Sequence, residues 1–406
     1  MSREADPTEL LTASSALYAD GGTDPVNAAP ALHLAGMLHR AVHDADGYLP
    51  FSRFMEMVLY EPGFGYYSGE QTRFGADGDF ITAAEHSNLY AESIALQVAE
   101  VLDGFGGEGE ILEFGAGSGR FAGDLLQALG KRSSVPKQYT IMEVSAELKA
   151  CQRRVLTSYV DQGIVRWSSA MPAAGFVGVV IANEVLDAMP VTRFQKLRSG
   201  QFAELGVGAR SRDFIWRTRL AGPQLSDELM EIERSLGMAL PDGYVSEVNL
   251  LQSPWIGSVS DMLKRGLVLI CDYGYTRREY YHCDRNNGTL ICHHRHRVNY
   301  NPFINIGLQD ISASVDFSAV AHAARRHQLQ VSGYANQAQF LLSCGLDRIL
   351  SELQTEAPEQ YLEFAAQAKM LTLPSEMGER FKVMALTRDI KTPLCGFELQ
   401  DLCGRL

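Results

Sequence analysis

The sequence predicts an α/β protein built on a parallel, doubly wound sheet. Apolar strand-like runs alternate with amphipathic helical runs from residue 110 onward, and this alternation is typical of parallel sheets with helices on both faces. A glycine-rich turn directly follows the first of these strands. The chain has 406 residues with 46% hydrophobic content, which is enough for one large core and an accessory unit.

Composition and charge exclude several functional classes. The formal net charge of −13 disfavours a protein that holds nucleic acid on a broad basic surface. No apolar segment reaches the roughly 18 to 20 residues that span a bilayer, and the acidic N-terminus lacks the pattern of a signal or transit peptide. The seven scattered cysteines are typical of reduced thiols. We therefore expect a cytoplasmic bacterial protein, with no nucleic acid partner and no membrane insertion; a homodimer is compatible with these features.

The N-terminal part is predicted to be helical. Residues 1–30 are interpreted as a flexible tail. Apolar residues recur at helical spacing in residues 31–42 and 51–60, and prolines and glycines then interrupt the pattern. Residues 31–86 are therefore interpreted as a helical cap that ends in a loop, and residues 87–406 as the main domain.

Strands and helices alternate through the main domain. The interval between Val185 and Leu267 is too long for one crossover helix and contains a hairpin pattern at 193–208. An inserted subdomain is therefore predicted at about 190–262. The last two predicted strands are expected to form a terminal hairpin. The predicted helices cover about 87–102, 120–129 and 146–159, and the predicted strands cover 111–115, 139–144, 164–168, 177–184, 267–275, 330–336 and 380–388.

The turn after the first strand contains Gly115, Gly117 and Gly119, and it closely follows Glu113. Glycine lets the backbone approach a ligand, and the helix that follows presents free N–H groups. A dinucleotide fingerprint needs its third glycine at the position of Arg120, so an NAD cofactor is disfavoured. A cofactor with an ammonium, a carboxylate and a ribose fits better, because Glu113 can bind the ammonium directly or through water. A glycine-rich turn without a ligand remains the structural alternative.

Glu143 ends the next predicted strand, 26 residues after Gly117. An acid that binds ribose is expected on this strand, at an offset of roughly 20 residues. Its carboxylate can accept hydrogen bonds from both ribose hydroxyls, whereas an isolated glutamate after a strand more often faces solvent.

Several segments carry a family resemblance. The stretch ILEFGAGSGR resembles motif I of class I S-adenosylmethionine-dependent methyltransferases. Further segments are similar, in the same order, to the MidA-like family of these enzymes: FSRFMEMVLYEPGFGYYSG, FGADGDFITAAEHS, IANEVLDAMPVTRF, CDYGYTRREYY, GTLICHHRHR and GLQDISASVDFSAV. The resemblance runs from about residue 35 to residue 390.

The resemblance implies fold, cofactor and activity. The implied fold is a Rossmann-like class I methyltransferase sheet of strand order 3-2-1-4-5-7-6 with an N-terminal helical cap and a family-specific insertion. The implied cofactor is S-adenosyl-L-methionine. Because the family includes a mitochondrial complex I assembly factor that methylates a protein arginine, the resemblance also implies a protein substrate presenting an arginine, with a respiratory complex I-type subunit as one candidate.

The resemblance further implies which residues bind the cofactor. The loop at 78–82 matches the G-D-F-x-T pattern of the family and is expected to close over the cofactor; alternatively, Asp79 caps the helix that follows. By motif position, the expected cofactor-binding residues are Gly78, Asp79, Phe80, Thr82, Glu113, Gly115, Ala116, Gly117, Gly119, Glu143, Val144 and Asn183.

The segment IANEVLDAMP follows the fourth strand, at the carboxyl edge where open α/β sheets bind ligands. Asn183 and Glu184 are expected to face the transferred methyl group, with Asp187 one helical turn further on. A protonated arginine acceptor needs a planar acid partner, for which Glu184 is the first candidate and Asp187 the second. Alternatively, Asn183 and Asp187 cap a helix with Glu184 in its first turn. Methyl transfer requires positioning and exclusion of water, not a nucleophilic cysteine.

Two further clusters have open roles. Residues 292–297, CHHRHR, lie near Cys283 but lack the paired ligand intervals of zinc sites, and neighbours on an extended strand point to opposite faces, so no metal is predicted. Arg295 and Arg297 either meet acidic groups of a protein substrate or form surface salt bridges. An aromatic group either walls the acceptor pocket or packs within the cap; its members are Tyr60, Phe64, Tyr66 and Tyr67.

Three functional hypotheses follow. The first is methylation of a protein arginine. The second is methylation of a small molecule or another side chain, because cofactor motifs do not encode the acceptor. The third is an assembly or scaffold protein with a vestigial cofactor site. The intact acids and glycines at the ends of the first two strands argue against this hypothesis.

Overall fold

The computed structural model describes residues 25–69, 85 and 87–406, with side chains from residue 29 onward. The predicted cofactor-covering loop at 78–82 and residues 1–24 of the predicted tail lie outside the described residues. Helix α2 (Pro25–Asp44) begins inside the range predicted as a tail. In the described part of the chain, no helix is long and apolar enough to cross a membrane.

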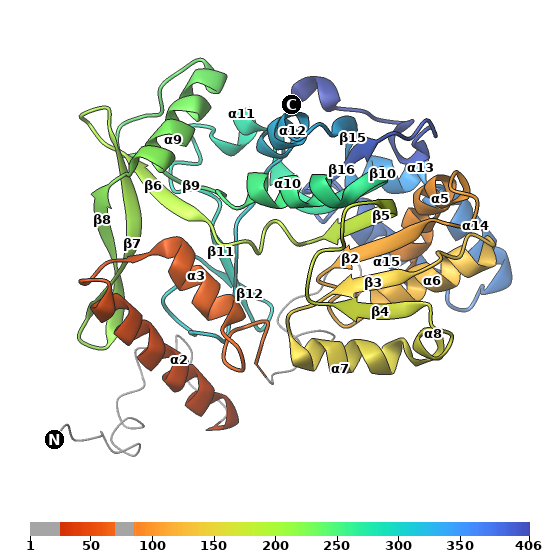
Figure 1. The fold of residues 1–406 in the computed structure, drawn as a ribbon, viewed down its shortest axis with the longest axis horizontal. Helices are drawn as coiled ribbons and strands as arrows, with labels where there is room; N and C mark the ends of the chain where they lie inside the picture. Colours follow the sequence, from red (N-terminus) through yellow and green to blue (C-terminus); the bar gives the residue numbers. More distant parts are fainter. Residues whose placement is uncertain (1–24, 70–84, 86) are drawn as a thin grey trace.

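The main sheet follows the predicted strand order (Figure 1). Its path is β15-β16-β10-β5-β2-β3-β4, which reads 3-2-1-4-5-7-6 from β4 when the seven strands are numbered along the chain. All neighbours are parallel except that β16 runs antiparallel to both β10 and β15. An eighth strand that was not predicted, β14 (Val315–Asp316), pairs with β10. The seven strands are β2 (Glu110–Phe114), β3 (Tyr139–Met142), β4 (Val165–Ser168), β5 (Phe176–Asn183), β10 (Leu263–Tyr275), β15 (Gln330–Asn336) and β16 (Phe381–Arg388).

Helices cover both faces of this sheet and divide the core in two. Ile111 and Ile181 belong to one apolar cluster, whereas their neighbours Leu112 and Val180 belong to the other. Burial on both faces explains why the strands are continuously apolar in sequence. The first face is covered by α5 (Asn88–Asp103), α6 (Arg120–Lys131), α13 (Gln337–Ser343), α14 (Leu346–Glu356) and α15 (Tyr361–Thr372), and the second by α10 (Gln252–Met262) and α12 (Phe317–Arg326).

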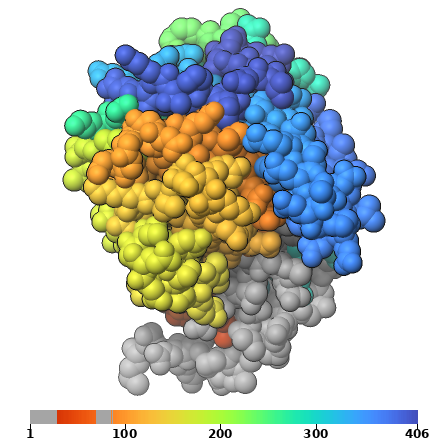
Figure 2. All heavy atoms as spheres, turned by 90° about the vertical axis from the view of Figure 1, so that its right-hand side faces the viewer, coloured from red at the N-terminus to blue at the C-terminus, as the bar shows by residue number. Residues whose placement is uncertain are grey.

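The C-terminal helices complete the first face. Viewed from the side, the blue helices α14 and α15 lie beside the orange α5 (Figure 2). The last two long strands pair antiparallel as predicted, but helices α13 to α15 separate them in the chain, so they form no simple hairpin. The chain ends with two short 3-10 helices, η2 (Cys395–Phe397) and η3 (Cys403–Arg405).

The helix predicted at 146–159 is interrupted. It forms α7 (Ala146–Val155) and α8 (Thr157–Asp161), with Leu156 between them. The Thr157 hydroxyl donates hydrogen bonds to the carbonyls of Arg153 and Arg154 at 2.9 and 3.0 Å. Such back-bonding by threonine bends helices, which accounts for the break.

The predicted insertion forms a second sheet together with the cap. Leu49 pairs with Val207 of the insertion, so the two regions share one sheet. They also share one apolar cluster, which includes Phe54 and Phe214. The helix α10 at the end of the predicted insertion packs instead into the main core. The elements are β1 (Leu49–Pro50), α3 (Phe51–Tyr60), β6 (Thr192–Lys196), β7 (Phe202–Arg210), β8 (Asp213–Leu220), α9 (Pro223–Leu236) and β9 (Val245–Val248).

A small third sheet lies between these two parts. Its order is β12-β11-β13. The strands are β11 (Ile291–His294), β12 (Arg297–Asn299) and β13 (Asp310–Ser312), and the short helix α11 (Arg277–Tyr280) precedes them.

Candidate active site

A cavity of about 240 Å³ lies at the carboxyl ends of β2, β3 and β5. Most of the predicted site residues that the structure describes line it. One half of its wall is formed by Glu113, Gly115, Ala116, Gly117, Glu143 and Val144, and the other by Tyr60, Tyr66, Tyr67, Asn183, Glu184, Asp187 and Asp310.

The three glycines of the turn have different roles. All three have positive φ angles, of 61° at Gly115, 54° at Gly117 and 88° at Gly119. A Cβ on Gly115 would come no closer than 3.9 Å to another side chain, so the backbone there borders open space. A Cβ on Gly119 would lie 3.1 Å from the Cα of Gln152. Gly119 is not part of the cavity wall, and the lack of a side chain there allows α6 to pack closely against α7.

Glu143 is held by several hydrogen bonds. Its Oε1 accepts from the backbone N–H groups of Val144 and Ser145 at 2.9 and 3.0 Å, and its Oε2 accepts from the Gln152 amide at 3.0 Å. Burial raises the pKa of Glu143, whereas these donors lower it. Because a carboxylate oxygen can accept two hydrogen bonds, Oε2 retains one position for a ligand hydroxyl.

Two residues that the sequence analysis missed complete this half of the site. The Gln152 amide also donates to the carbonyl of Gly117 at 2.9 Å and accepts from the Trp167 indole at 2.7 Å, so it links the turn to β3 and β4. Glu85 accepts from the Ser118 hydroxyl at 2.5 Å and lines the cavity. Glu85 lies in the segment FGADGDFITAAEHS that carries the family resemblance, whereas no motif in the sequence marks Gln152.

Glu113 is a buried acid that faces the cavity. Its side chain accepts a hydrogen bond of 2.8 Å from the Tyr139 hydroxyl. Burial raises the pKa of Glu113 to about 8, so a cationic ligand would restore its charge. Val144 is 77% exposed and lines the same cavity, which offers an apolar surface to a flat ring. These features fit a ligand with an ammonium, a ribose and an aromatic base.

The segment after β5 is a turn and not a helix, so the helix-capping alternative for Asn183, Glu184 and Asp187 is wrong. The carboxylate that caps this turn is Asp272 of β10, whose Oδ2 accepts from the backbone N–H groups of Leu186 and Asp187 at 3.0 and 3.3 Å. Capping by a distant strand leaves the side chains of the turn available for the cavity.

Glu184 is strained and lacks hydrogen-bond partners. Its φ angle is 52°, a left-handed conformation that costs about 1–2 kcal/mol for a residue with a side chain. Both carboxyl oxygens are buried without a partner among the described residues, although the nearby Asn183 amide favours the charged form. Burial, followed by the charges of Asp187 and Asp310, raises the pKa of Glu184 well above its ordinary value. Asn183 accepts from the Tyr90 hydroxyl at 2.6 Å, which fixes its amide.

Asp187 and Asp310 lie beside Glu184. Asp187 is 6% exposed, and its Oδ1 accepts no direct hydrogen bond among the described residues, although the Tyr273 hydroxyl and the backbone N–H of Ala188 lie near enough to favour its charged form. Burial, followed by the charge of Asp310, raises the pKa of Asp187 to about 7. Asp310 accepts from the hydroxyls of Tyr67 and Ser312, each at 2.9 Å. Asp310 was not among the predicted site residues, although it lies in the segment GLQDISASVDFSAV that carries the family resemblance.

Three of the four predicted aromatic residues form one wall of the cavity. The rings of Tyr60 and Tyr67 stack with centroids 5.5 Å apart, and Tyr60 donates to the carbonyl of Ala188 at 2.9 Å. Tyr66 completes the wall. Phe64 instead stacks on His33 at 4.4 Å and does not line the cavity.

The CHHRHR segment is a tight hairpin and not a single extended strand. Arg295 and His296 occupy the turn with positive φ angles of 50° and 60°, and His294 pairs with Arg297 across it. Cys292 is buried, whereas Cys283 is exposed. His293 Nδ1 lies 3.9 Å from Asp310 Oδ2, so the hairpin contacts the acidic side of the cavity.

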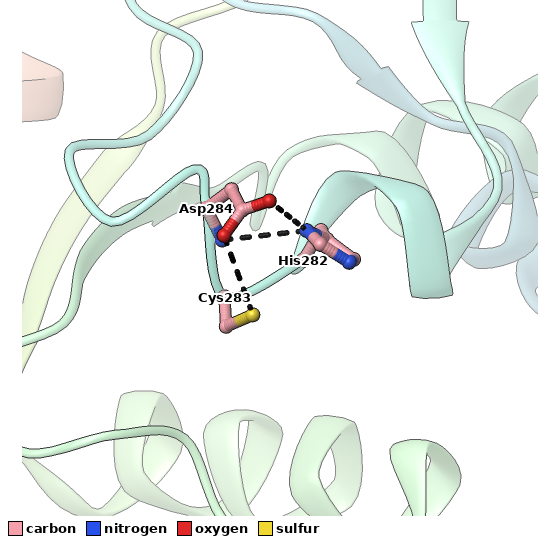
Figure 3. Close-up of side chains that lie close together, drawn as sticks. All are labelled: His282, Cys283 and Asp284. Atoms are coloured by element: carbon pink, nitrogen blue, oxygen red, sulfur yellow. Dashed lines mark hydrogen bonds and ion pairs between the residues drawn. The ribbon is translucent and has the colours of Figure 1, made fainter.

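The structure also brings together a different set of potential metal ligands. In the part of the chain that the structure describes, His282, Cys283 and Asp284 lie close enough to share an ion (Figure 3). They are consecutive, exposed and hydrogen-bonded to one another, with Cys283 Sγ donating to Asp284 at 3.7 Å. None of these three side chains is buried or held in place as a metal ligand would be, so they do not support a metal site.

A second cavity of about 260 Å³ lies between α9, α11 and α12. A buried ion pair of 3.0 Å between Arg277 and Asp316 lies in its wall. Among the described residues, no buried polar atom without a partner belongs to this wall. The unpartnered acids therefore distinguish the first cavity as the candidate active site.

Comparisons with known proteins agree with this geometry. A family model of S-adenosyl-L-methionine-dependent methyltransferases matches residues 93–335. The mitochondrial protein arginine methyltransferase NDUFAF7 homolog of Drosophila melanogaster is 28% identical over 391 residues, covering 86% of this chain and 85% of the relative. The human NDUFAF7 protein is 25% identical over 410 residues, covering 91% and 86%.

A solved structure is more similar. A protein of Burkholderia thailandensis, solved with S-adenosyl-homocysteine bound, is 38% identical and superposes with a TM-score of 0.88. The match covers 95% of this chain and 99% of the other.

Proposed function

The chain belongs to the family of S-adenosyl-L-methionine-dependent methyltransferases, and we propose that it methylates an arginine side chain of a protein. S-adenosyl-L-methionine, when bound, supplies a methyl group that is already activated on a sulfonium. The protein therefore needs to hold the acceptor in line, exclude water and place charge around the acceptor nitrogen.

Residues of the first two strands are proposed to hold the cofactor. Glu143 binds the ribose hydroxyls, and Glu113 binds the ammonium. Gly115 and Gly117 let the backbone approach, and the exposed Val144 contacts the adenine. The support is that these residues line one continuous wall and that Glu113 is a buried acid without a cationic partner among the described residues.

The observation that carries the arginine proposal is the unpartnered acid group beside this wall. Both oxygens of Glu184 and Oδ1 of Asp187 are buried without hydrogen bonds among the described residues. A buried carboxyl group without a partner costs about 1–3 kcal/mol, so such a group is typical of a site that a cation completes. Glu184 and Asp187 are proposed to bind the guanidinium as a pair of acids.

The shape of the site also favours a flat cation. A guanidinium is planar and presents several N–H donors in one plane, whereas an ammonium is a compact point charge. The stacked rings of Tyr60 and Tyr67 offer flat faces next to the acids, and cations are attracted to such faces. The relatives named as protein arginine methyltransferases point to the same acceptor, and the MidA-like resemblance makes a complex I-type subunit the first candidate.

A labelling experiment tests the proposal. The purified protein is incubated with S-adenosyl-L-methionine labelled on its methyl group and with lysate from source cells that lack the protein. Labelled proteins are then hydrolysed, and their amino acids are separated. Methylarginine is expected. Label in lysine or in a small molecule would favour the second hypothesis, and no transfer would favour the scaffold.

Three variants test the proposed roles of Glu184 and Asp187. Glu184→Gln and Asp187→Asn are each expected to lower transfer at least about 100-fold while binding of S-adenosyl-homocysteine changes little. Asp213→Asn removes an exposed carboxylate at the edge of β8 and is expected to transfer at the wild-type rate. Wild-type transfer by Glu184→Gln would contradict the assignment.

A further inference from the structure

Asp187 and Asp310 form a pair of acids with unequal hydrogen bonding. Each oxygen of Asp310 accepts a hydroxyl, Oδ1 from Tyr67 and Oδ2 from Ser312. Asp187 has an open oxygen, Oδ1, in the wall of the cavity. The backbone links them, because the N–H of Ala313 donates to the carbonyl of Asp187 at 3.0 Å. Asp187 is therefore placed to touch a substrate, whereas Asp310 is placed to act on Asp187.

We propose that Asp187 accepts the proton that the acceptor nitrogen loses during methyl transfer, and that Asp310 is a positioning residue whose negative charge makes Asp187 a competent acceptor. This inference rests on the proposed function, because it assumes a protonated guanidinium as the acceptor.

The proton balance of the step requires such a group. As the acceptor nitrogen forms its bond to the methyl carbon, the carbon–sulfur bond breaks and its electron pair stays on sulfur. The nitrogen loses one N–H proton, which moves to Oδ1 of Asp187. The products are a methylated guanidinium, a neutral thioether and one protonated carboxyl group.

Asp187 suits this task better than its acidic neighbours. Burial and the charge of Asp310 raise its pKa to about 7, and a general base works best near the ambient pH. Burial raises the pKa of Glu184 well above its ordinary value, which suits a carboxyl group that becomes charged when the cation binds. Within the described part of the chain, Asp272 accepts hydrogen bonds from the backbone N–H groups of Leu186, Asp187 and Tyr273, so it is engaged in holding the turn.

The pKa values of the ring and hydroxyl groups around the pair are shifted away from neutral pH. Burial lowers the pKa of His293, which disfavours its charged form. Burial raises the pKa values of Tyr60, Tyr67 and Tyr273, which therefore remain hydroxyls. A titration near neutral pH at this site consequently reports on the carboxyl groups.

Carbon NMR of the side-chain carboxyl groups tests the inference without any acceptor. The protein is labelled with ¹³C-aspartate, and the Asp187 resonance is identified by its loss in Asp187→Asn. In Asp310→Asn, the titration midpoint of Asp187 is expected to fall by about 1 pH unit, because a neighbouring negative charge is removed. Asp310→Glu keeps the charge and is expected to keep the midpoint, as is the exposed control Asp213→Asn. An unchanged midpoint in Asp310→Asn would overturn the role of Asp310.

A kinetic measurement uses the arginine acceptor found by labelling. The rate kcat/KM is expected to rise with pH as Asp187 loses its proton, and Asp310→Asn should move this rise to lower pH by about 1 unit. A purely structural role of Asp310 would lower the rate at every pH without moving the rise. Ser312→Ala is a milder second variant that removes one hydroxyl from Asp310, and it should move the rise in the same direction by less.

A failure of the proposed function and a failure of this inference give different experimental results. If the wild-type protein methylates no arginine, the proposed function fails, and Asp187 has no acceptor proton to receive. If it methylates arginine and Asp310→Asn moves neither the NMR midpoint nor the kinetic rise, the inference alone fails.

Discussion

The side-chain amide of Gln152 donates a hydrogen bond of 2.9 Å to the backbone carbonyl of Gly117. The same amide donates to Glu143, so one side chain of α7 sets the separation between the glycine turn and the acid proposed to bind ribose. Binding of the cofactor should therefore depend on a residue that is buried and absent from the cavity wall.

Gln152→Leu tests this dependence. The substitution keeps the size of the side chain and removes its hydrogen bonds to Gly117 and Glu143. Affinity for S-adenosyl-homocysteine, measured by isothermal titration calorimetry, is expected to fall about 10-fold, since a hydrogen bond to a charged group contributes about 1.5–3 kcal/mol. The control Gln162→Leu, at the exposed end of α8, should bind normally; equal affinities of the two variants would refute the positioning role.

Binding of the cofactor product should release a proton from Glu113. Its pKa of about 8 leaves this carboxyl group mostly protonated at pH 7, and an ammonium beside it favours the charged form. The binding enthalpy of S-adenosyl-homocysteine at pH 7 should therefore depend on the ionisation enthalpy of the buffer. Glu113→Gln should show less buffer dependence and weaker binding. If wild type and Glu113→Gln release the same number of protons, Glu113 is not the group that ionises.

The acids of the site should make stability depend on pH. The pKa of Asp187 rises from 3.8 to about 7 on folding, so the folded state holds its proton more tightly than the unfolded state. The free energy of unfolding should fall as pH rises from about 4 through 7. In Asp187→Asn this decline should be smaller, leaving the variant about 1–3 kcal/mol more stable than wild type at pH 8. Urea denaturation at pH 5 and pH 8 measures the difference, and a variant less stable at both would argue against it.

Alanine substitutions at two glycines, one in α6 and one in the turn before it, should change the stability of the protein in opposite directions. Gly119→Ala places a Cβ 3.1 Å from the Cα of Gln152 at a φ angle of 88°, so a loss of about 2 kcal/mol or more in stability is expected. Gly130 lies within the helix with no atom near its absent Cβ, so Gly130→Ala should gain about 0.5–1 kcal/mol. Thermal unfolding of both variants decides the point. Equal effects would show that Gly119 has no special packing role.

Local sequence patterns were sufficient for the main sheet and for half of the site. The strands buried on both faces are continuous apolar runs, and each predicted strand of the main sheet is present. Glu113 and Glu143 lie on or directly after neighbouring parallel strands, whose carboxyl ends meet at the same edge. The motif spacing therefore predicted that both acids lie on one cavity wall.

The half of the cavity that we propose binds the acceptor depends on contacts between segments far apart in the chain. Asp310 reaches the cavity because β13 packs against the turn that contains Asp187, and that turn is capped by Asp272 of another strand. The alternative of a helix after β5 was wrong because these long-range hydrogen bonds hold the segment as a turn. The cap and the insertion likewise share a sheet through Leu49 and Val207, a pairing with no signal in either segment.

The sequence by itself thus determined the alternating architecture, the order of the main sheet through its family resemblance, and the position of Glu113 and Glu143 in one cavity wall. The burial pattern of a strand or helix and the geometry of a strand–turn–helix unit depend on residues that are neighbours in the chain. The tertiary structure alone decided which acids meet at the acceptor side and which of them lack hydrogen-bond partners. Those properties arise when segments far apart in the chain pack together and exclude water from the same small volume.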